Sequence, residues 1–170
     1  MSHTAYIAVG TNLGDRVGNY RTAIEKIGEL ADTRVSRVSS MYESEPHGRA
    51  RNWFLNGAIE VVTEQDSVDL LKDLKNIEKA MGRKPTPKGK GKNANVSRII
   101  DLDILLFDLE IIDTRALKVP HLELANRKFV LLPLAELAPS TVHPVLGASI
   151  SILLAQTPDE GRVRMFREPN

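Results

Sequence analysis

The segment SRIIDLDILLFD, residues 97–108, sets acidic residues into an otherwise apolar run, and this pattern restricts the structure it can form. On a helix, residues two apart point in different directions, whereas in a strand they lie on one face. The run is short, rich in isoleucine, leucine and phenylalanine, and followed by a polar residue, which predicts a strand. Ile100, Leu102 and Ile104 would then face a hydrophobic core.

Asp101 and Asp103 would lie side by side on the opposite face of this strand. Two strand steps separate them by about 7 Å. In a protein-surface medium with an effective dielectric constant of about 20, two such charges repel by roughly 2 kcal/mol. Residues 99–107 contain no basic side chain that could offset this repulsion. The pattern therefore predicts that a positive group from elsewhere lies beside the two carboxylates.

The composition is that of an ordinary globular domain. The 170 residues are 42% hydrophobic, so we expect one full core and a single domain over residues 1–170. The absence of cysteine excludes disulfides, thiolate metal sites and a cysteine nucleophile. The sequence has neither a basic start followed by a long apolar segment nor a run of about eighteen apolar residues, so we expect a cytoplasmic protein without a membrane partner. The net charge of +1 argues against wholesale binding of nucleic acid.

Hydrophobic periodicity predicts four strands and two helices before residue 108. The strands are expected at residues 6–9, 34–45, 54–63 and 97–108, the second and third being antiparallel neighbours. Asp15 and Asp66 precede the two helical patterns and can cap them, and Gly82 stands where the second helix would end. The apolar stripes are Val17, Tyr20, Ile24, Ile27 and Ala31 in the first helix, and Val68, Leu71, Leu74, Ile77 and Met81 in the second.

This order, β-α-β-β-α-β, is that of a ferredoxin-like α+β fold, in which both helices cover one face of an antiparallel sheet. Asp101 and Asp103 would emerge on the uncovered face. The chain after residue 108 contains Pro120, Pro133, Pro139 and Pro144. These prolines predict short helical turns packed near the end of the sheet.

Residues 83–98, RKPTPKGKGKNANVSR, carry six basic residues, no acidic residue, and prolines and glycines that prevent a long helix or strand. A loop of about this length in a small domain is usually functional or disordered. It ends three residues before Asp101, so the most basic part of the chain adjoins its acidic pair. A solvated surface loop is the alternative interpretation, but this position favours capture of phosphate.

Two carboxylates beside a basic loop indicate Mg²⁺ bound together with a polyphosphate, because Mg²⁺ is usually held by one or two carboxylates plus substrate phosphates. The alternative is a solvated sheet face that carries two acidic residues without a function. The segment GTNLGDR, residues 10–16, is not a P-loop, because no Lys-Ser or Lys-Thr pair follows Gly14. We interpret it as a tight turn between strand and helix.

Six segments, spread over nearly the whole chain, carry a family resemblance. They are AYIAVGTNLGDR (5–16), YESEPHG (42–48), FLNGAIEV (54–61), IEKAMGR (77–83), RIIDLDILLFD (98–108) and VPHLELANRKFVLLPLAELAP (119–139). In this order they resemble the 6-hydroxymethyl-7,8-dihydropterin pyrophosphokinase family of folate biosynthesis. One matching segment would support the resemblance only moderately, whereas six segments in the family's order support it strongly.

The resemblance implies an ATP-dependent diphosphotransferase that moves the β,γ-pyrophosphoryl unit of ATP to the hydroxymethyl group of a reduced pterin and releases AMP. It also implies two Mg²⁺ ions and a monomeric protein. The catalytic residues would be Arg83, Arg98, Asp101 and Asp103, of which the two aspartates bind the metal. The ATP-binding residues would be Glu78, Arg98, Ile104 (through its backbone), His121 and Arg127, and the pterin-binding residues Ser44, Glu45, His47, Phe54, Asn56 and Phe129.

These assignments agree with the chemistry of the residues. A flat pterin needs aromatic faces and an edge of matched hydrogen bonds, which Phe54, Phe129 and Asn56 can supply. Core packing is the alternative role for the two phenylalanines. Arginine suits the phosphate side, because its planar fork matches pairs of phosphate oxygens. His47 and His121 both lie beside a proline in a loop, where a histidine taken alone would usually be polar surface.

The chain departs from the family in its basic loop, which is longer and ends in KNANVSR instead of an Arg-x-Trp-Gly-Pro-Arg-like sequence. No tryptophan of this loop could close over the pterin. Two other function classes remain as alternatives. An RNA-binding module would need aromatic residues on the central strands and a signature that is missing here. A sensor that binds nucleotide without turning it over would have little use for the carboxylate pair.

Overall fold

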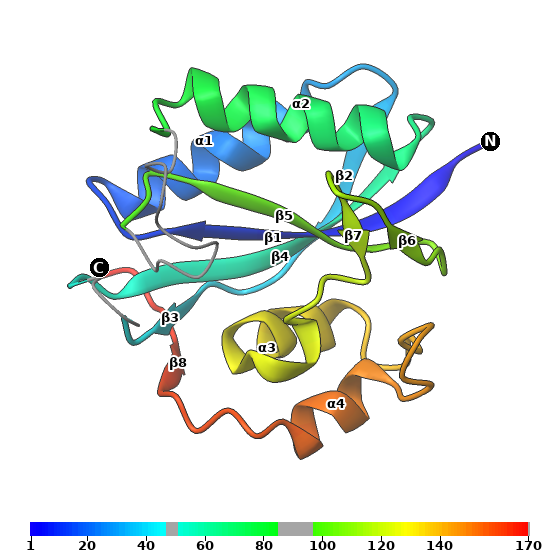
Figure 1. The fold of residues 1–170 in the computed structure, drawn as a ribbon. Coiled ribbons are helices and arrows are strands. Elements are labelled where there is room, and N and C mark those ends of the chain that lie inside the picture. Colours follow the sequence, from blue (N-terminus) through cyan, green and yellow to red (C-terminus); the bar gives the residue numbers. More distant parts are fainter. Residues whose placement is uncertain (47–50, 85–96, 170) are drawn as a thin grey trace.

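An antiparallel sheet between two layers of helices forms the centre of this computed structural model, which describes residues 1–46, 51–84 and 97–169 (Figure 1). The strands of the sheet are β1 (His3–Thr11), β2 (Thr33–Val38), β3 (Tyr42–Ser44), β4 (Phe54–Thr63), β5 (Asp101–Phe107) and β8 (Val163–Met165). The helices are α1 (Arg16–Gly28), α2 (Ser67–Ala80), α3 (Lys128–Leu137) and α4 (Ile150–Gln156). The ribbon of β6 (Ile112–Asp113) and β7 (Lys118–Val119) and the 3-10 helix η1 (Leu124–Asn126) follow β5. Within the described ranges, no helix is long and apolar enough to cross a membrane.

The strand order β5-β1-β4-β3-β8, with β2 also paired to β4, confirms the ferredoxin-like α+β fold. The strand predicted over residues 34–45 is divided into β2 and β3, which both pair with β4. At the division, the Ser39 hydroxyl accepts the N–H of Ala58 at 2.9 Å, and the Ser39 N–H donates to the Ala58 carbonyl at 2.9 Å. A side chain thus replaces a backbone acceptor, so the chain can bend here while β4 keeps its partners.

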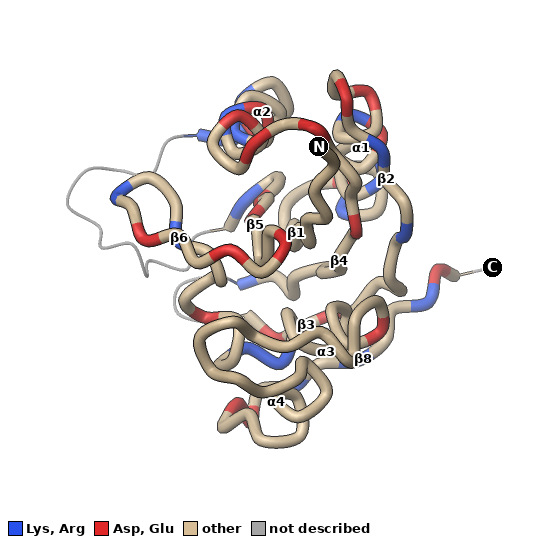
Figure 2. Tube along the Cα trace, turned by 90° about the vertical axis from the view of Figure 1, so that its right-hand side faces the viewer, with Lys and Arg blue, Asp and Glu red and all other residues tan. Residues whose placement is uncertain are grey.

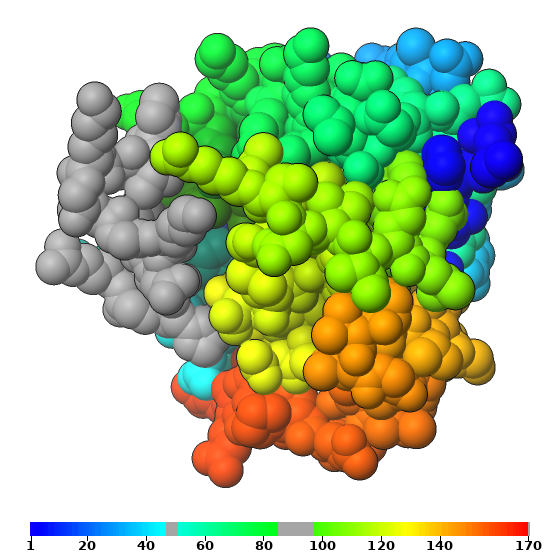
Figure 3. Space-filling view, turned by 45° about the vertical axis from the view of Figure 1, so that its right-hand side comes forward, coloured from blue at the N-terminus to red at the C-terminus, as the bar shows by residue number. Residues whose placement is uncertain are grey.

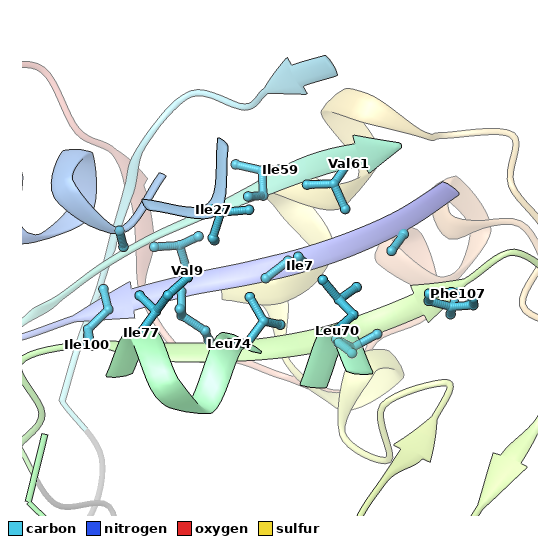
Figure 4. Packing of buried hydrophobic residues seen from close by; sticks show 14 of the residues in the cluster. Ile7, Val9, Ile27, Ile59, Val61, Leu70, Leu74, Ile77, Ile100 and Phe107 are labelled. Carbon is cyan, nitrogen blue, oxygen red and sulfur yellow. The ribbon is translucent and has the colours of Figure 1, made fainter. Parts of the chain in front are cut away.

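The hydrophobic core between the sheet and the pair α1 and α2 contains Ile100, Leu102 and Ile104, as the alternation in β5 predicts. Figure 4 shows Ile7 and Ile59 from the strands beside this layer of helices. The core side chains are almost fully removed from water, and burial of each one stabilises the fold by about 1.5–3 kcal/mol.

The predicted caps of α1 and α2 are confirmed, but their apolar stripes need correction. Asp15 and Asp66 each accept a backbone N–H in the first turn of their helix, at 3.0 Å and 2.9 Å. Ala31 lies beyond the end of α1. On α2, Val68 is 64% exposed, whereas Leu70 is fully buried. Adjacent apolar residues make the phase of a short helix ambiguous, and contact with the sheet decides it.

The second face of the sheet is also covered, which corrects the expectation of an open face. Figure 1 shows α3 and α4 on the side opposite α1 and α2. Leu105 and Leu106 of β5 pack there against Leu131 and Leu134 of α3. Pro133 lies inside α3, so the prediction of short turns is wrong for this helix. Proline removes one backbone donor, and burial of the apolar side of α3 offsets that loss.

Gly57 of β4 makes room for Tyr20 of α1, which is a testable feature of the core. A Cβ atom at position 57 would lie 1.9 Å from the Tyr20 hydroxyl oxygen, and Tyr20 is only 2% exposed. We expect Gly57→Ala to lower the free energy of unfolding by about 1–3 kcal/mol, because the buried ring must shift. Urea denaturation measures this change. Gly28→Ala is the control, since its Cβ would meet Val35 at 3.8 Å and stability should be unchanged or slightly higher. Equal stability of the two variants would contradict the expectation.

Candidate active site

A cavity of about 630 Å³ lies at the start of β5, between the sheet and the chain that follows β6. The sheet side contributes Gly10, Ser44, Phe54, Asn56, Arg98, Asp101, Asp103 and Ile104. The opposite side contributes Ala116, Leu117, Lys118, His121, Leu122, Glu123, Asn126, Arg127 and Phe129. Leu71 and Lys75 of α2 and Asp159 near the C-terminus complete the lining. Figure 3 shows the covering segment, yellow-green to yellow, between the green α2 and the orange α4.

Asp101 and Asp103 lie on the floor of the cavity because the neighbouring strand offers small residues there. Asp101 pairs with Gly10 of β1, and Asp103 pairs with Ala8. Asn56 of β4 lies beyond Gly10 in the same row of the sheet. Side chains no larger than a methyl group leave open space beside both carboxylates. The predicted strand thus presents its acidic pair to a cavity, as the alternation indicates.

Two arginines supply part of the positive charge that the acidic pair requires. The guanidinium of Arg83 donates to Asp101 Oδ1 at 2.9 Å, and that of Arg98 donates to the same oxygen at 3.2 Å. Arg83 and Arg98 are the first and last residues of the basic loop, whose positions 85–96 lie outside the described residues. Figure 2 shows acidic and basic positions together near the start of β5. The sequence interpretation assigned this neutralisation to a metal ion, whereas protein groups already provide some of it.

Glu78, near the end of α2, holds Arg83 in place through an ion pair. Its carboxylate forms an ion pair with Arg83 and accepts the backbone N–H of Leu102 at 3.0 Å. Burial raises the pKa of Glu78 above its usual value, and Arg83 works in the opposite direction. For Arg83, burial opposes the charged form, but the carboxylates of Asp101 and Glu78 outweigh it and raise the pKa. Neither residue is part of the cavity lining.

Asp103 is the least compensated carboxylate of this group. Within the described residues no hydrogen bond or ion pair to its side chain is found. Burial raises the pKa of Asp103 to about 7, and repulsion from Asp101 and Glu78 adds to the rise. Among the described residues, three carboxylates face two guanidiniums, so an added cation would be stabilised here. Oxygen ligands of this kind fit Mg²⁺, with Asp101 and Asp103 as the residues that would hold it.

Asn12 is a site residue that the sequence interpretation missed. Its side-chain oxygen accepts the backbone N–H of Arg98 at 2.7 Å, and its amide donates to Ser97 Oγ at 3.2 Å and to the Asn52 carbonyl at 3.3 Å. Asn12 is 1% exposed. The turn of residues 10–16 therefore ties together two segments that meet at the cavity. The sequence signal that could have identified Asn12 is its position, as a polar residue between Gly10 and Gly14 of the turn.

The aromatic and amide groups expected to bind a pterin line the same cavity, and the part of it that Phe54, Asn56 and Phe129 line is called here its pterin end. Phe54 and Phe129 both line it, from β4 and α3. Asn56, 6% exposed, donates from its side-chain amide to Ser44 Oγ at 2.8 Å, which fixes the orientation of the amide. The guanidinium of Arg127 lies 5.7 Å from the centre of the Phe129 ring. This end can hold a flat heterocycle between its faces and read its edge.

His121 is held as a hydrogen-bond donor toward the cavity. Its Nδ1 accepts the N–H of Glu123 at 3.1 Å, so the neutral ring carries its proton on Nε2. Burial lowers the pKa of His121, and the neighbouring Arg127 lowers it further. The ring is therefore mainly neutral at pH 7, with one N–H available to a phosphate oxygen.

Of the remaining expected pterin-binding residues, one lies outside the cavity lining and one lies outside the described part of the chain. Glu45 lies outside the cavity lining and forms an ion pair with Arg162 at 3.2 Å. His47 lies outside the described residues. Lys75, Lys118 and Asp159 line the cavity but were missed, because nothing local in their sequence sets them apart from surface residues.

Comparisons with known proteins show which family this chain is similar to. A family model described as 7,8-dihydro-6-hydroxymethylpterin-pyrophosphokinase (HPPK) matches residues 6–139. A 2-amino-4-hydroxy-6-hydroxymethyldihydropteridine pyrophosphokinase from Bacillus subtilis is 41% identical over 99% of this chain and 93% of its own length. The protein of the same name from Pseudomonas aeruginosa is 37% identical over 97% of this chain and 98% of its own length.

Some relatives are much longer than this chain. The folic acid synthesis protein fol1 of Schizosaccharomyces pombe is 35% identical over 95% of this chain, which spans only 21% of that protein. A solved structure of Plasmodium falciparum HPPK-DHPS A437G with pteroate aligns with a TM-score of 0.70 at 17% identity, over 92% of this chain and 41% of the other. At that identity the likeness shows the fold alone.

Proposed function

We propose a pyrophosphoryl transfer for this chain, which belongs to the 7,8-dihydro-6-hydroxymethylpterin-pyrophosphokinase family. The reaction moves the β,γ-pyrophosphoryl unit of ATP to the hydroxymethyl group of 6-hydroxymethyl-7,8-dihydropterin. The hydroxymethyl group loses its proton to water and its oxygen bonds to the β-phosphorus, the bond from that phosphorus to the α,β-bridging oxygen breaks, and AMP leaves. The observation that carries the proposal is one cavity with an aromatic and amide end next to a cluster of carboxylates and arginines.

The chain's own residues would mainly bind and position the two substrates, which is the principal task in phosphoryl transfer. Arg98, His121 and Arg127 line the cavity and can donate to phosphate oxygens. Glu78 would act through Arg83, whose guanidinium it holds near Asp101. Asp101 and Asp103 would hold two Mg²⁺ ions, which neutralise phosphate charge and align the triphosphate.

The two substrates would occupy different parts of the cavity. Phe54 and Phe129 would stack on the pterin, and Asn56 would bind its edge, with backbone groups near Ser44 completing that edge. Ile104 lies on β5, an edge strand of the sheet, so backbone groups on its outer side can bind adenine. The alternative of an RNA-binding module is not favoured, because α3 and α4 cover the sheet face that RNA would need.

The direct test incubates the purified protein with Mg-ATP and 6-hydroxymethyl-7,8-dihydropterin and separates the products by chromatography. We expect AMP and the pterin pyrophosphate in equal amounts, and no AMP when the pterin is omitted. Formation of ADP would indicate ordinary kinase chemistry and contradict the proposal. Binding of both substrates without any turnover would instead indicate a sensor.

A further inference from the structure

We propose that residues 157–166, called here the C-terminal strap, position the two aromatic walls of the pterin end of the cavity. This inference rests on the proposed function, since it concerns how that substrate is held. The strap follows the last residue that the family model matches, residue 139. It contacts the segment that carries Phe54 and also the start of the helix that carries Phe129.

On one side, the strap is joined to β3 and to Trp53. β8 pairs with β3 and places Val163 opposite Ser44, a residue of the cavity lining. The guanidiniums of Arg162 and Arg164 lie 5.5 Å and 4.5 Å from the centre of the Trp53 ring. Trp53 directly precedes Phe54, so contacts that fix the tryptophan also limit the movement of the phenylalanine. Each exposed cation–π contact contributes only about 0.5–1 kcal/mol, and the strand pairing adds to them.

On the other side, Asp159 of the strap caps the helix of Phe129. The residue at the N-cap position of α3, Arg127, forms no capping hydrogen bond with its side chain. Asp159 Oδ2 accepts the N–H of Lys128, the first residue of the helix, at 2.8 Å. A carboxylate at this position also interacts favourably with the helix dipole. A residue distant in sequence therefore supplies the cap that the local sequence lacks.

The short chain between these contacts links the two walls. Three residue steps separate Asp159 from Arg162, and an extended chain covers at most about 3.6 Å in each step. The turn at Asp159 is fixed further, because Asp159 Oδ1 accepts the N–H of Gly161 at 2.8 Å. The strap thus limits how far Phe54 and Phe129 can separate. Its loss should weaken pterin binding and leave the phosphate side of the cavity intact.

The test compares Asp159→Ala with a matched control, Asp66→Ala. Asp66 caps α2 by accepting the N–H of Asp69 at 2.9 Å, but it does not line the cavity. Both variants lose one cap, which costs about 0.5–2 kcal/mol of stability. We expect Asp159→Ala to raise the KM for the pterin about fivefold, with the KM for ATP and kcat within twofold of wild type. Asp66→Ala should change none of these constants.

A second variant keeps the test valid if the alanine variant folds poorly. Asp159→Asn retains an acceptor oxygen, so it should recover most of the pterin affinity. The intrinsic fluorescence of Trp53, the single tryptophan of the chain, measures pterin binding independently of turnover. Equal changes in the KM for ATP and for pterin, or no change in either, would overturn the role of the strap while the wild type still formed AMP. A wild type that forms no AMP would overturn the proposed function, and this inference with it.

Discussion

Replacing Asp103 with asparagine is expected to make the metal-free protein more stable while it lowers AMP formation at least about a hundredfold. Activity should fall because asparagine removes one of the two carboxylates that would hold Mg²⁺, a contribution of several kcal/mol to the transition state. Stability should rise because burial, followed by the charges of Asp101 and Glu78, raises the pKa of Asp103 to about 7 in the folded protein. The ionised side chain therefore costs free energy at neutral pH, as is common where function opposes stability.

The raised pKa of Asp103 determines how the stability gain of Asp103→Asn changes with pH. A folded pKa above the unfolded value of 3.8 means that the cost of the charge is absent below about pH 4 and grows as the pH rises toward about 7. The gain from Asp103→Asn should be largest at pH 8 and vanish near pH 4. Urea denaturation in EDTA measures it. Asp113→Asn, at an exposed position outside the cavity lining, is the control. Undiminished AMP formation by Asp103→Asn would refute its role in catalysis.

Arg98→Ala is expected to lower kcat/KM for ATP roughly a hundredfold, which corresponds to about 2.7 kcal/mol. The backbone of Arg98 is fixed by Asn12, and its guanidinium lies 3.2 Å from Asp101 while lining the cavity. The variant removes a hydrogen-bond donor to phosphate. Among the described residues, it also leaves Arg83 as the remaining arginine beside Asp101. Steady-state kinetics with ATP varied at saturating pterin measure the change.

Arg98→Lys separates charge from geometry at the same position. Lysine keeps the positive charge but lacks the planar fork, so its kcat/KM should lie between those of alanine and wild type. Arg34→Ala, an exposed arginine on β2 outside the lining, should behave like the wild type. If Arg98→Ala used ATP as efficiently as that control, the arginine would be needed only to neutralise Asp101.

Much of the fold could be predicted because short-range patterns encode it. The strand at residues 54–63 has the bounds expected from its composition, and Asp15 and Asp66 cap their helices as predicted. The acidic pair of β5 shares one face because alternation is a property of any strand. The cavity also brings together Ser44, Phe54, Asn56, His121 and Phe129, which were predicted from resemblance to the family and not from local pattern.

Other features depended on contacts between distant parts of the chain. Neither the helices that cover the second face nor the buried side of α2 follows from periodicity, because adjacent apolar residues allow more than one phase. Asn12 and Asp159 look like ordinary loop residues until their partners, Arg98 and Lys128, are seen. Their role is to satisfy backbone groups far away in sequence, which no local pattern records.

The sequence by itself determined which residues alternate, where the first helices begin, and that two carboxylates share a strand face. These depend on backbone geometry over a few residues, which neighbouring side chains largely set. Only the tertiary structure decided that Arg83 and Arg98 meet Asp101. It also decided that the C-terminal strap contacts both Trp53, beside Phe54, and the start of the helix that carries Phe129. Such contacts arise when the apolar faces of distant elements are buried together, so the packing of the whole chain selects the partners of each polar group.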